Sequence, residues 1–278
     1  MKHCQLLRSL LKSEHPLVMP DAYDALSARL IENAGFKAVQ CSGYSMSLAA
    51  GCKTEDDLSF DRNLQITQDI TRSVSIPVMA DGEDGYGPPD KVATTVKAFV
   101  NIGVSGINLE DQILRSSGPK GVIDAGLMVE KIVAARRAGK ECNTPDLVIN
   151  GRTDALSAAK DRRSGLREAI DRANRYLEAG ADLVFVTSVA TLDEAKTLAN
   201  EISGPLSIAA GLPYNIETLS IDNLRDCGVA RISLPAIAVF AVIRAIQQTL
   251  HAITVQDDFQ ELQRLKLLCT IEDIAKLK

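Results

Sequence analysis

Short β-branched segments alternate with helical patterns from Leu17 to about Ala252, and this alternation is the strongest constraint on the fold. The predicted strands lie too far apart for hairpins, and their spacing suits strand–helix–strand crossovers between parallel strands. Eight strands are predicted: Leu17–Met19, Ala38–Cys41, Pro77–Ala80, Gly106–Leu109, Leu147–Asn150, Leu183–Val186, Leu206–Ala209 and Arg231–Leu234. Eight such units in one chain favour a closed α/β barrel, the (β/α)8 TIM barrel, over an open doubly wound sheet.

The joints between helices and strands support the same architecture. Four predicted helices end in a glycine followed by an apolar residue, at Gly35, Gly103, Gly180 and Gly228. A glycine just after a helix adopts the left-handed conformation that ends the helix, and the next apolar residue enters a strand. The recurrence therefore predicts one kind of joint used repeatedly.

The length and the lack of a linker predict a single domain. The chain has 278 residues, and single (β/α)8 barrels have roughly 250. No low-complexity segment divides residues 1–278, so we expect one barrel domain over the whole chain. The last part, about 256–278, is a charged amphipathic pattern that we expect to form a helical extension packed on a partner subunit.

Charge and composition exclude some classes of partner. With 31 Lys and Arg against 36 Asp and Glu, the net charge is −5, and no basic excess exists to neutralise a phosphate backbone. The chain has no Trp, and no uninterrupted apolar run reaches the roughly 18 residues expected of a membrane span. The first residues lack the pattern of a secretory signal. We therefore expect no nucleic-acid partner, no membrane and a cytoplasmic location.

The cysteine and histidine patterns argue against a soft-metal site. The six cysteines are far apart, without a CxxC spacing, and we expect reduced thiols. Only three histidines occur, two of them within the first fifteen residues. An acid–base site built on histidine is therefore hard to assemble.

Acidic residues follow the third and fourth predicted strands. In a (β/α)8 barrel the active site lies at the carboxyl ends of the strands. Asp81 and Glu83 follow the third strand, where alternate positions of an extended segment would share one side, and Glu110 follows the fourth. Three converging carboxylates repel one another unless a cation bridges them, and oxygen ligands favour Mg²⁺ or Mn²⁺. The alternative is that Asp81 and Asp84 cap turns while Glu110 pairs with Arg152.

Other polar groups follow neighbouring strands. Arg152 follows the fifth strand, where a guanidinium can bind a carboxylate or phosphate, so we expect an anionic substrate. A structural ion pair of Arg152 with Glu110 or Asp154 is the alternative, and it is compatible with that role. Ser42, Gly43 and Tyr44 follow the second strand and can present donors to a ligand oxygen, although a plain turn would look the same. The segment 111–121, with two glycines and two cations, suggests either a lid or a surface loop.

These motifs, taken in order, resemble the isocitrate lyase and phosphoenolpyruvate mutase superfamily. The matching residues are Ser42-Gly43, Asp81-Gly-Glu83-x-Gly-Tyr-Gly87, Leu109-Glu110-Asp111 and Gly151-Arg152-Thr153, which span nearly the whole chain. The resemblance implies a (β/α)8 barrel whose C-terminal helix is exchanged between subunits of a homodimer or homotetramer. It also implies Mg²⁺ held by Asp81 and, through water, by Glu83 and Glu110. The substrate would be a 2-oxo or 2-hydroxy acid that contacts Ser42, Gly43 and Tyr44 near Arg152 and reacts through an enolate.

Departures from the family pattern leave the reaction open. Isocitrate-type lyases carry a lid with a cysteine and a histidine, whereas the segment Arg115–Gly121 has neither. Phosphoenolpyruvate mutases use an aspartate, a lid asparagine and a histidine; Thr54 and Thr187 stand at the first and last of these positions, with Glu55 and Asp56 adjacent to the first. The sequence is most similar to members without the lid cysteine, either oxaloacetate decarboxylase-like or methylisocitrate lyase-like.

We therefore predict a Mg²⁺-dependent carbon–carbon lyase or decarboxylase that acts on a small di- or tricarboxylic acid through a metal-stabilised enolate. The alternatives are a phosphoenolpyruvate mutase-like or phosphonopyruvate hydrolase-like phosphonate enzyme and a catalytically inactive barrel that binds a metabolite. Arg152, Tyr44 and Glu110 are the predicted catalytic residues, and Ser42, Gly43, Tyr44, Asp81 and Arg152 are predicted to bind substrate. Loops 211–215 and Pro235 are expected to fit the substrate's side group.

Overall fold

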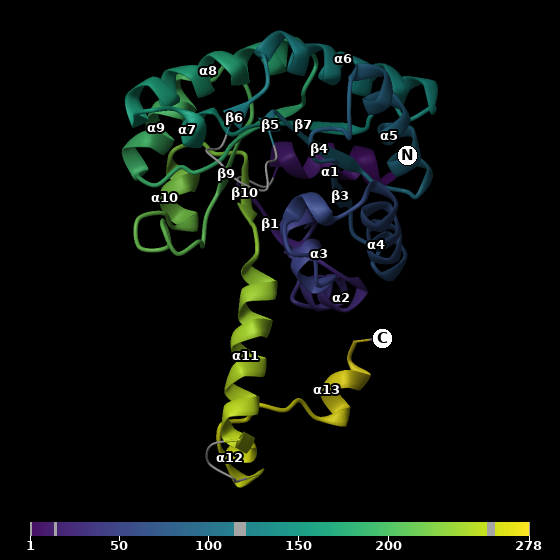
Figure 1. Cartoon of the computed structure of the whole chain (residues 1–278), viewed down its shortest axis with the longest axis vertical. Coiled ribbons are helices and arrows are strands. Elements are labelled where there is room, and N and C mark those ends of the chain that lie inside the picture. The colour runs from purple at the N-terminus through teal and green to yellow at the C-terminus, as the bar shows by residue number, and fades with distance from the viewer. Residues whose placement is uncertain (1, 14–15, 114–120, 255–258, 278) are drawn as a thin grey trace.

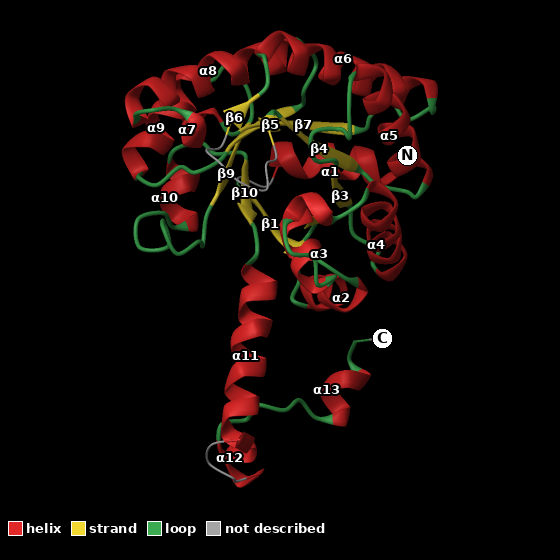
Figure 2. Ribbon diagram, viewed as in Figure 1, coloured by secondary structure: helices red, strands yellow, loops and turns green. Residues whose placement is uncertain are grey.

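The computed structural model describes residues 2–13, 16–113, 121–254 and 259–277. Eight strands close into a barrel in which every neighbouring pair is parallel and β10 pairs with β1 (Figure 2). The predicted α/β class and the (β/α)8 barrel are confirmed. The barrel strands are β1 (Leu17–Ala22), β2 (Val39–Cys41), β3 (Val78–Asp81), β4 (Gly106–Glu110), β7 (Val148–Thr153), β8 (Leu183–Val186), β9 (Leu206–Ala209) and β10 (Arg231–Leu234).

Strand boundaries agree best with the sequence in the second half of the barrel. The last three strands have the predicted bounds, whereas β1 runs on through Pro20 to Ala22 and β7 continues to Thr153. Proline cannot donate a hydrogen bond to a neighbouring strand and usually ends one, yet β1 continues to pair beyond it, with Leu234 opposite Pro20 and Gln40 opposite Asp21. The extension of β7 places Arg152 inside a strand instead of after it.

Most helices lie around the outside of the barrel, whereas α11, α12 and α13 extend away from it (Figure 1). The helices of the first half of the chain are α1 (Lys2–Ser13), α2 (Ala25–Asn33), α3 (Gly43–Ala49), the 3₁₀ turn Glu55–Asp57, α4 (Phe60–Ser73), α5 (Pro89–Asn101) and α6 (Ala125–Glu141). The later ones are α7 (Ala155–Ala158), α8 (Arg162–Glu178), α9 (Leu192–Glu201), α10 (Ile221–Asp226), α11 (Ile237–Thr254), α12 (Phe259–Arg264) and α13 (Ile271–Ala275).

The four glycine joints form as predicted. Gly35, Gly103, Gly180 and Gly228 have φ values of 91°, 93°, 105° and 79°, all in the left-handed region that favours glycine. Their amides donate to carbonyl oxygens of the preceding helical turn. Each joint therefore ends its helix at a fixed point and sends the next strand back into the barrel.

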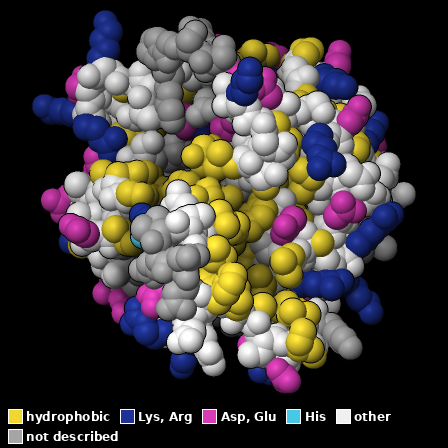
Figure 3. All heavy atoms as spheres, turned by 60° about the horizontal axis from the view of Figure 1, so that its bottom comes forward, with side chains coloured by type: hydrophobic (Ala, Val, Ile, Leu, Met, Phe, Trp, Pro, Cys, Tyr) yellow, Lys and Arg dark blue, Asp and Glu magenta, His cyan; other side chains and the backbone are white. Residues whose placement is uncertain are grey.

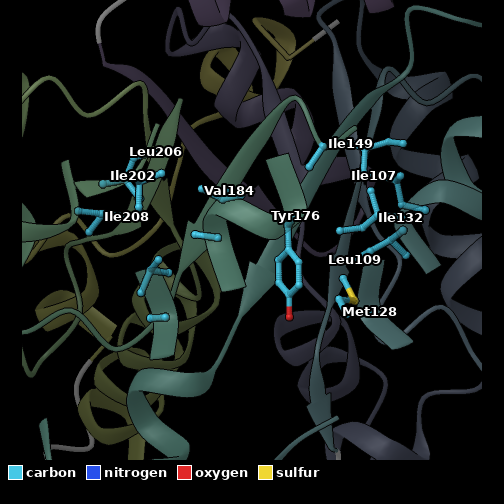
Figure 4. Close-up of a cluster of buried hydrophobic side chains, with 14 of the residues drawn as sticks. Ile107, Leu109, Met128, Ile132, Ile149, Tyr176, Val184, Ile202, Leu206 and Ile208 are labelled. Carbon is cyan, nitrogen blue, oxygen red and sulfur yellow. The ribbon is translucent and has the colours of Figure 1, made fainter. Parts of the chain in front are cut away.

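Three hydrophobic clusters position the strands. The largest lies between the barrel and helices such as α5, α6 and α8, where Ile107, Ile149, Tyr176 and Val184 are buried together (Figure 4). Another lies between the first barrel strands and the helices α2 and α4, and includes Ala28, Val39 and Ile70. The third includes the interior of the barrel, where Met19, Met79, Val148 and Leu183 form a cluster with Leu7 of α1. The helix α1 therefore covers the end of the barrel opposite the predicted active site. The six cysteines are free thiols, as predicted.

Helix α11 projects away from the barrel (Figure 1). Most of its large apolar side chains are exposed, namely Ile237, Phe240, Val242, Ile243, Ile246, Leu250 and Ile253. Figure 3 looks towards this end of the molecule and shows hydrophobic side chains gathered across the middle of the face. In the described part of the chain, α11 alone has the length and apolar content to cross a membrane, and only 11% of its residues are buried. Length and composition are weak grounds for a membrane span, and the helix also contains Arg244, Gln247 and Gln248.

Candidate active site

Three buried carboxylates converge at the carboxyl ends of β3 and β4. One oxygen atom from each of Asp81, Glu83 and Glu110 lies within 4.8 Å of the others. Asp81 is the last residue of β3 and Glu110 is the last residue of β4, and these two strands are paired neighbours. The barrel register therefore brings together residues that are far apart in sequence.

Glu83 reaches the cluster by a different route from the extended segment that the sequence suggested. The strand β3 ends at Asp81. Glu83 itself has a φ of 49°, and this left-handed backbone conformation sets the direction of its side chain. Its backbone oxygen accepts a hydrogen bond from the Glu110 amide at 2.9 Å. Non-glycine residues in this region are uncommon and cluster at functional sites, where surrounding contacts maintain them.

The environment of the carboxylates disfavours three negative charges without a cation. Burial, followed by the charges of Asp81 and Glu110, raises the pKa of Glu83 well above its usual range. Burial likewise raises the pKa of Glu110, although the guanidinium of Arg152 opposes this shift. Among the described atoms, Glu83 Oε2 is buried without a hydrogen-bond partner. An orphaned carboxylate oxygen within a cluster of three hard oxygen ligands fits a divalent ion such as Mg²⁺ or Mn²⁺.

Arg152 lies beside the acidic cluster and joins two acids. Its Nη1 is 2.6 Å from Glu110 Oε2, and its Nε donates to Asp154 Oδ2 at 2.8 Å. Burial alone would lower the pKa of Arg152, but Asp154 and Glu110 raise it well above its usual value. The structural ion pairs considered from the sequence therefore form. The side chain is still 19% exposed, and it lines the neighbouring pocket.

The Ser42–Tyr44 segment forms the start of α3. Ser42 caps this helix by accepting a hydrogen bond from the Ser45 amide, and the Gly43 amide donates to Asp81 Oδ2 at 2.9 Å. A Cβ atom on Gly43 would lie 1.8 Å from Glu83 Oε1, so only glycine permits this approach. Ser42 and Tyr44 line the pocket, whereas Gly43, which was also predicted to bind substrate, is not among the lining residues and contacts the acidic cluster through its amide.

Several positioning residues were missed by the sequence analysis. Asn150 Nδ2 donates to Asn108 Oδ1 at 2.7 Å, and Asn108 Nδ2 donates to Asp81 Oδ1 at 3.3 Å, so two amides from adjacent strands orient Asp81. On the outer side, Lys131 Nζ of α6 donates to the Asp84 carbonyl at 2.6 Å. The sequence did contain a signal for Asn108, because a polar residue within a predicted buried strand needs a hydrogen-bond partner. Nothing local marked Lys131.

The barrel interior also contains a buried cation that the sequence analysis did not identify. Arg231 is 2% exposed, and its Nη2 donates to Gln40 Oε1 at 2.8 Å. Burial lowers the pKa of Arg231 to about 9, although the charge of Asp81 opposes this shift. The guanidinium carbons of Arg231 and Arg152 lie 5.4 and 5.9 Å from the ring centroid of Phe185, so this ring contacts both cations.

The predicted lid segment begins and ends in a short antiparallel pair. Strands β5 (Gln112–Ile113) and β6 (Gly121–Val122) pair with each other, which the sequence did not predict. The part of the expected lid between them, 114–120, lies outside the described residues. Before β5, buried Asp111 accepts hydrogen bonds from the Asp154 amide at 2.9 Å and from the Tyr176 hydroxyl at 2.7 Å. These contacts tie the segment after β4 to α8 and to Asp154, which follows the strand β7 that holds Arg152.

A cavity of about 530 Å³ opens at this end of the barrel. Its lining includes Ser42, Tyr44, Asp81 and Arg152, which brings four of the predicted site residues to one surface. Another hollow of similar size lies outside the barrel near α2 and α4, away from the carboxylates. Chemistry, not size, therefore identifies the cavity at the strand ends as the candidate active site.

Comparison with known proteins agrees with this geometry. The family described as phosphoenolpyruvate phosphomutase matches residues 7–254. The chain belongs to this family. A 2-methylisocitrate lyase from Escherichia coli (strain K12) is 31% identical over 255 residues, covering 88% of this chain and 82% of that protein. A 2,3-dimethylmalate lyase from Eubacterium barkeri is 32% identical over 200 residues, covering 71% and 68%.

A solved structure of a protein with a similar sequence shows the same fold. A phosphonopyruvate hydrolase in complex with oxalate and Mg²⁺ aligns with a TM-score of 0.87 and 27% identity, covering 100% of this chain and 95% of that one. The superfamily resemblance drawn from the sequence motifs is confirmed. The expectation of a lyase agrees with the names of the relatives, and a phosphonate enzyme is also among the similar structures.

Proposed function

We propose that the protein is a Mg²⁺- or Mn²⁺-dependent carbon–carbon lyase or decarboxylase that acts on a small 2-oxo or 2-hydroxy di- or tricarboxylic acid by way of an enolate. The observation that carries this proposal is the buried convergence of Asp81, Glu83 and Glu110 within 4.8 Å, next to a cation. These three residues would hold the ion. A bound divalent ion supplies positive charge that stabilises an enolate oxygen.

The remaining groups bind and orient the substrate. Arg152 presents its guanidinium at the pocket surface, where it would bind the carboxylate or the oxyanion of the reacting carbon. Ser42 and Tyr44 offer hydroxyl groups on the same surface to the substrate carboxylate. The Tyr44 hydroxyl is our proposed proton donor to the departing carbanion, and Glu110 would fix the position of Arg152 through their 2.6 Å contact. Gly43 would act through the hydrogen bond that it donates to Asp81.

A second candidate function is phosphonate chemistry. The favouring observation is that Glu55 and Asp56 line the same pocket, adjacent to Thr54, the position at which phosphonate members carry an aspartate. The similarity to a phosphonopyruvate hydrolase points the same way. The third candidate is an inactive barrel that binds a metabolite. Only a turnover measurement distinguishes it from the two enzymatic candidates.

Turnover on a panel of acids tests these alternatives. We would incubate the protein and Mg²⁺ with oxaloacetate, methylisocitrate, 2,3-dimethylmalate and phosphonopyruvate and measure the release of pyruvate or phosphate. We expect pyruvate from one of the first three, with the signal falling to background in Asp81→Ala and after chelation of the metal. Asp90→Ala, at an exposed position in α5, is the matched control. Release of phosphate from phosphonopyruvate, or its conversion to phosphoenolpyruvate, would favour the second candidate, and no turnover of any of the four acids would favour the inactive barrel.

We also propose that residues 1–278 form one domain with a C-terminal helical extension and that α11 is exchanged between two copies of the chain. The support is the exposed apolar surface of α11, which its own barrel does not cover, and the exposed Leu26 and Leu30 on α2. In this assembly, a homodimer or homotetramer, α11 packs against protein and not lipid.

A cytoplasmic location is part of the same proposal, and cell fractionation would test it.

A further inference from the structure

A positive charge lies inside the barrel, and the proposed function does not use it. Arg231 is the first residue of β10, deeper in the barrel than Pro235, which follows this strand and lines the substrate cavity. Arg152 and Arg172 pair with carboxylates, whereas among the described residues no carboxylate forms an ion pair with Arg231. Burial lowers the pKa of Arg231 only to about 9, so the guanidinium is charged at neutral pH.

The neighbours of this guanidinium are neutral and satisfy it only in part. Its Nη2 donates to Gln40 Oε1 at 2.8 Å, and Gln40 is oriented by the hydrogen bond that it donates to Ser233 Oγ at 2.7 Å. Its Nη1 donates to Met79 Sδ, a weak acceptor, at 2.9 Å. Among the described atoms, its Nε is buried without a hydrogen-bond partner. A buried charge without a counter-ion costs free energy, so packing alone does not account for an arginine at this position.

The guanidinium lies next to the groups that would hold the ion and the substrate. Arg231 lines a hollow of about 50 Å³ together with Ser42, Asp81 and Arg152. The guanidinium carbons of Arg231 and Arg152 also lie 5.4 and 5.9 Å from the centroid of the same Phe185 ring. A hollow of this size has room only for a few water molecules, and Arg231 does not line the larger cavity. Arg231 would therefore act on a bound acid through its charge and not through contact.

Formal charges indicate what this cation changes at the site. Four buried carboxylates and two guanidinium groups lie at or beside the ion site, namely Asp81, Glu83, Glu110 and Asp154, and Arg152 and Arg231. With all of these groups ionised, a bound divalent ion brings the sum of the charges to zero. Without Arg231, the same ion-loaded site would retain one negative charge, and this charge would repel an anionic acid.

We propose that Arg231 is a positioning residue that sets the charge of the site from inside the barrel, so that the ion-loaded site accepts an anionic acid. This inference rests on the proposed function and adds to it a residue outside the substrate cavity. Arg231 strengthens the binding of the acid and weakens the binding of the free metal ion. At an effective dielectric constant of about 20, a unit charge about 10 Å away changes the affinity for a univalent ion by about tenfold.

Two binding measurements on a neutral variant test the inference without requiring turnover. Arg231→Met removes the charge and keeps an apolar stem. We expect it to bind Mn²⁺ at least about threefold more tightly than wild type in titrations followed by electron paramagnetic resonance. We expect the Mn²⁺-loaded variant to bind oxalate, a chelating dianion, at least about threefold more weakly in calorimetric titrations. A residue with only a structural role would not shift the two affinities in opposite directions.

Three further variants separate the charge of Arg231 from its shape. Arg231→Gln retains a donor for Gln40 without the charge and should give the same two shifts as Arg231→Met. Arg231→Lys retains the charge and should have both wild-type affinities. Arg72→Met removes one positive charge at an exposed position of α4, which controls for the net charge of the protein, and should leave both affinities unchanged.

The outcomes distinguish this inference from the proposed function. A fall in both affinities, no change in either, or loss of folding in both neutral variants would overturn the role of Arg231. Shifts in Arg231→Lys as large as those in Arg231→Met would also overturn it, because the charge would then not be the cause. In each of these cases, binding of Mn²⁺ and oxalate by the wild-type protein would leave the proposed function intact. Failure of the wild-type protein to bind Mn²⁺ would overturn both.

Discussion

Single residues hold the acidic cluster in a geometry that the chain would not adopt by local preference. The turn after β3 contains two left-handed non-glycine residues, Glu83 and Tyr86. Asp84 between them accepts from the Tyr86 amide at 2.8 Å, and its carbonyl accepts from buried Lys131. The lysine also forms an ion pair with the Asp84 carboxylate at 3.2 Å. The turn that presents Glu83 is therefore supported from outside the barrel.

Removing this support should weaken metal binding without unfolding the protein. Lys131→Met keeps the apolar stem but loses both contacts with Asp84, so we expect Mn²⁺ affinity to fall by about 10- to 100-fold. Titration followed by electron paramagnetic resonance gives the dissociation constant. Lys97→Met, which removes a surface ion pair with Glu141, is the control and should leave it unchanged. An unaltered Mn²⁺ dissociation constant in Lys131→Met would show that the conformation of the turn after β3 does not depend on the lysine.

A second prediction concerns the pH dependence of stability at Asp21. Burial raises the pKa of this carboxyl in the folded protein, although hydrogen bonds from Ser45 and from the amides of Ala236 and Ala238 partly oppose the shift. The folded chain thus retains the proton to higher pH than the unfolded chain, whose aspartate titrates near about 3.9. The stability that this group contributes is present below that pH and is lost as pH rises through the folded pKa.

Asp21→Asn removes this titration. We therefore expect the difference in the free energy of unfolding, variant minus wild type, to be more positive at pH 8 than at pH 5, so that the variant gains stability relative to wild type as pH rises. Each unit of pKa difference corresponds to about 1.4 kcal/mol. Urea unfolding at the two pH values measures the effect, and a difference that is independent of pH would contradict it.

At the scale of elements, the sequence predicted the barrel because its signals are local. Strand composition and the glycine joints are features of a few consecutive residues, and they gave the last three strands with correct bounds. The acids were found because they directly follow strands. Contacts between distant segments had no such signal: the pair Lys131–Asp84 and the hydrogen bond from Asn150 to Asn108 depend on which elements become neighbours. The β5–β6 pair was missed for the same reason.

Helix α1 provides a prediction at this scale. Its Leu7 is fully buried and packs against the interior residues at the end of the barrel opposite the carboxylates. Leu7→Ala should lower the free energy of unfolding by about 2–5 kcal/mol, because it leaves a cavity in a close-packed core. Urea unfolding measures this loss, and Mn²⁺ affinity should not change. Leu6→Ala, at a side chain that is 44% exposed, should change the free energy of unfolding only slightly. Equal stability of both variants would show that α1 does not close the barrel.

For the whole molecule, the exposed stripe on α11 contrasts with the buried helices around the rest of the barrel. The contact between Phe240 and Tyr44 links this helix to the candidate active site, and Pro235 and Ala236, which precede it, line the same cavity. The position of α11 thus affects the shape of the pocket. If a second copy covers α11, assembly and substrate selection are coupled through the same few residues.

A charge in the middle of α11 tests this assembly. Ile246 is 52% exposed on the apolar stripe, and Ile246→Asp would place a charge in the proposed contact, where it would be desolvated without a partner. We expect the wild-type protein to sediment as a dimer or tetramer and the variant to shift towards the 29.9 kDa monomer in analytical ultracentrifugation. Gln248→Asp adds the same charge at an exposed polar position of the same helix and should not alter the mass. If wild type and Ile246→Asp sediment alike, α11 does not form the subunit contact, and its exposed stripe must serve another partner.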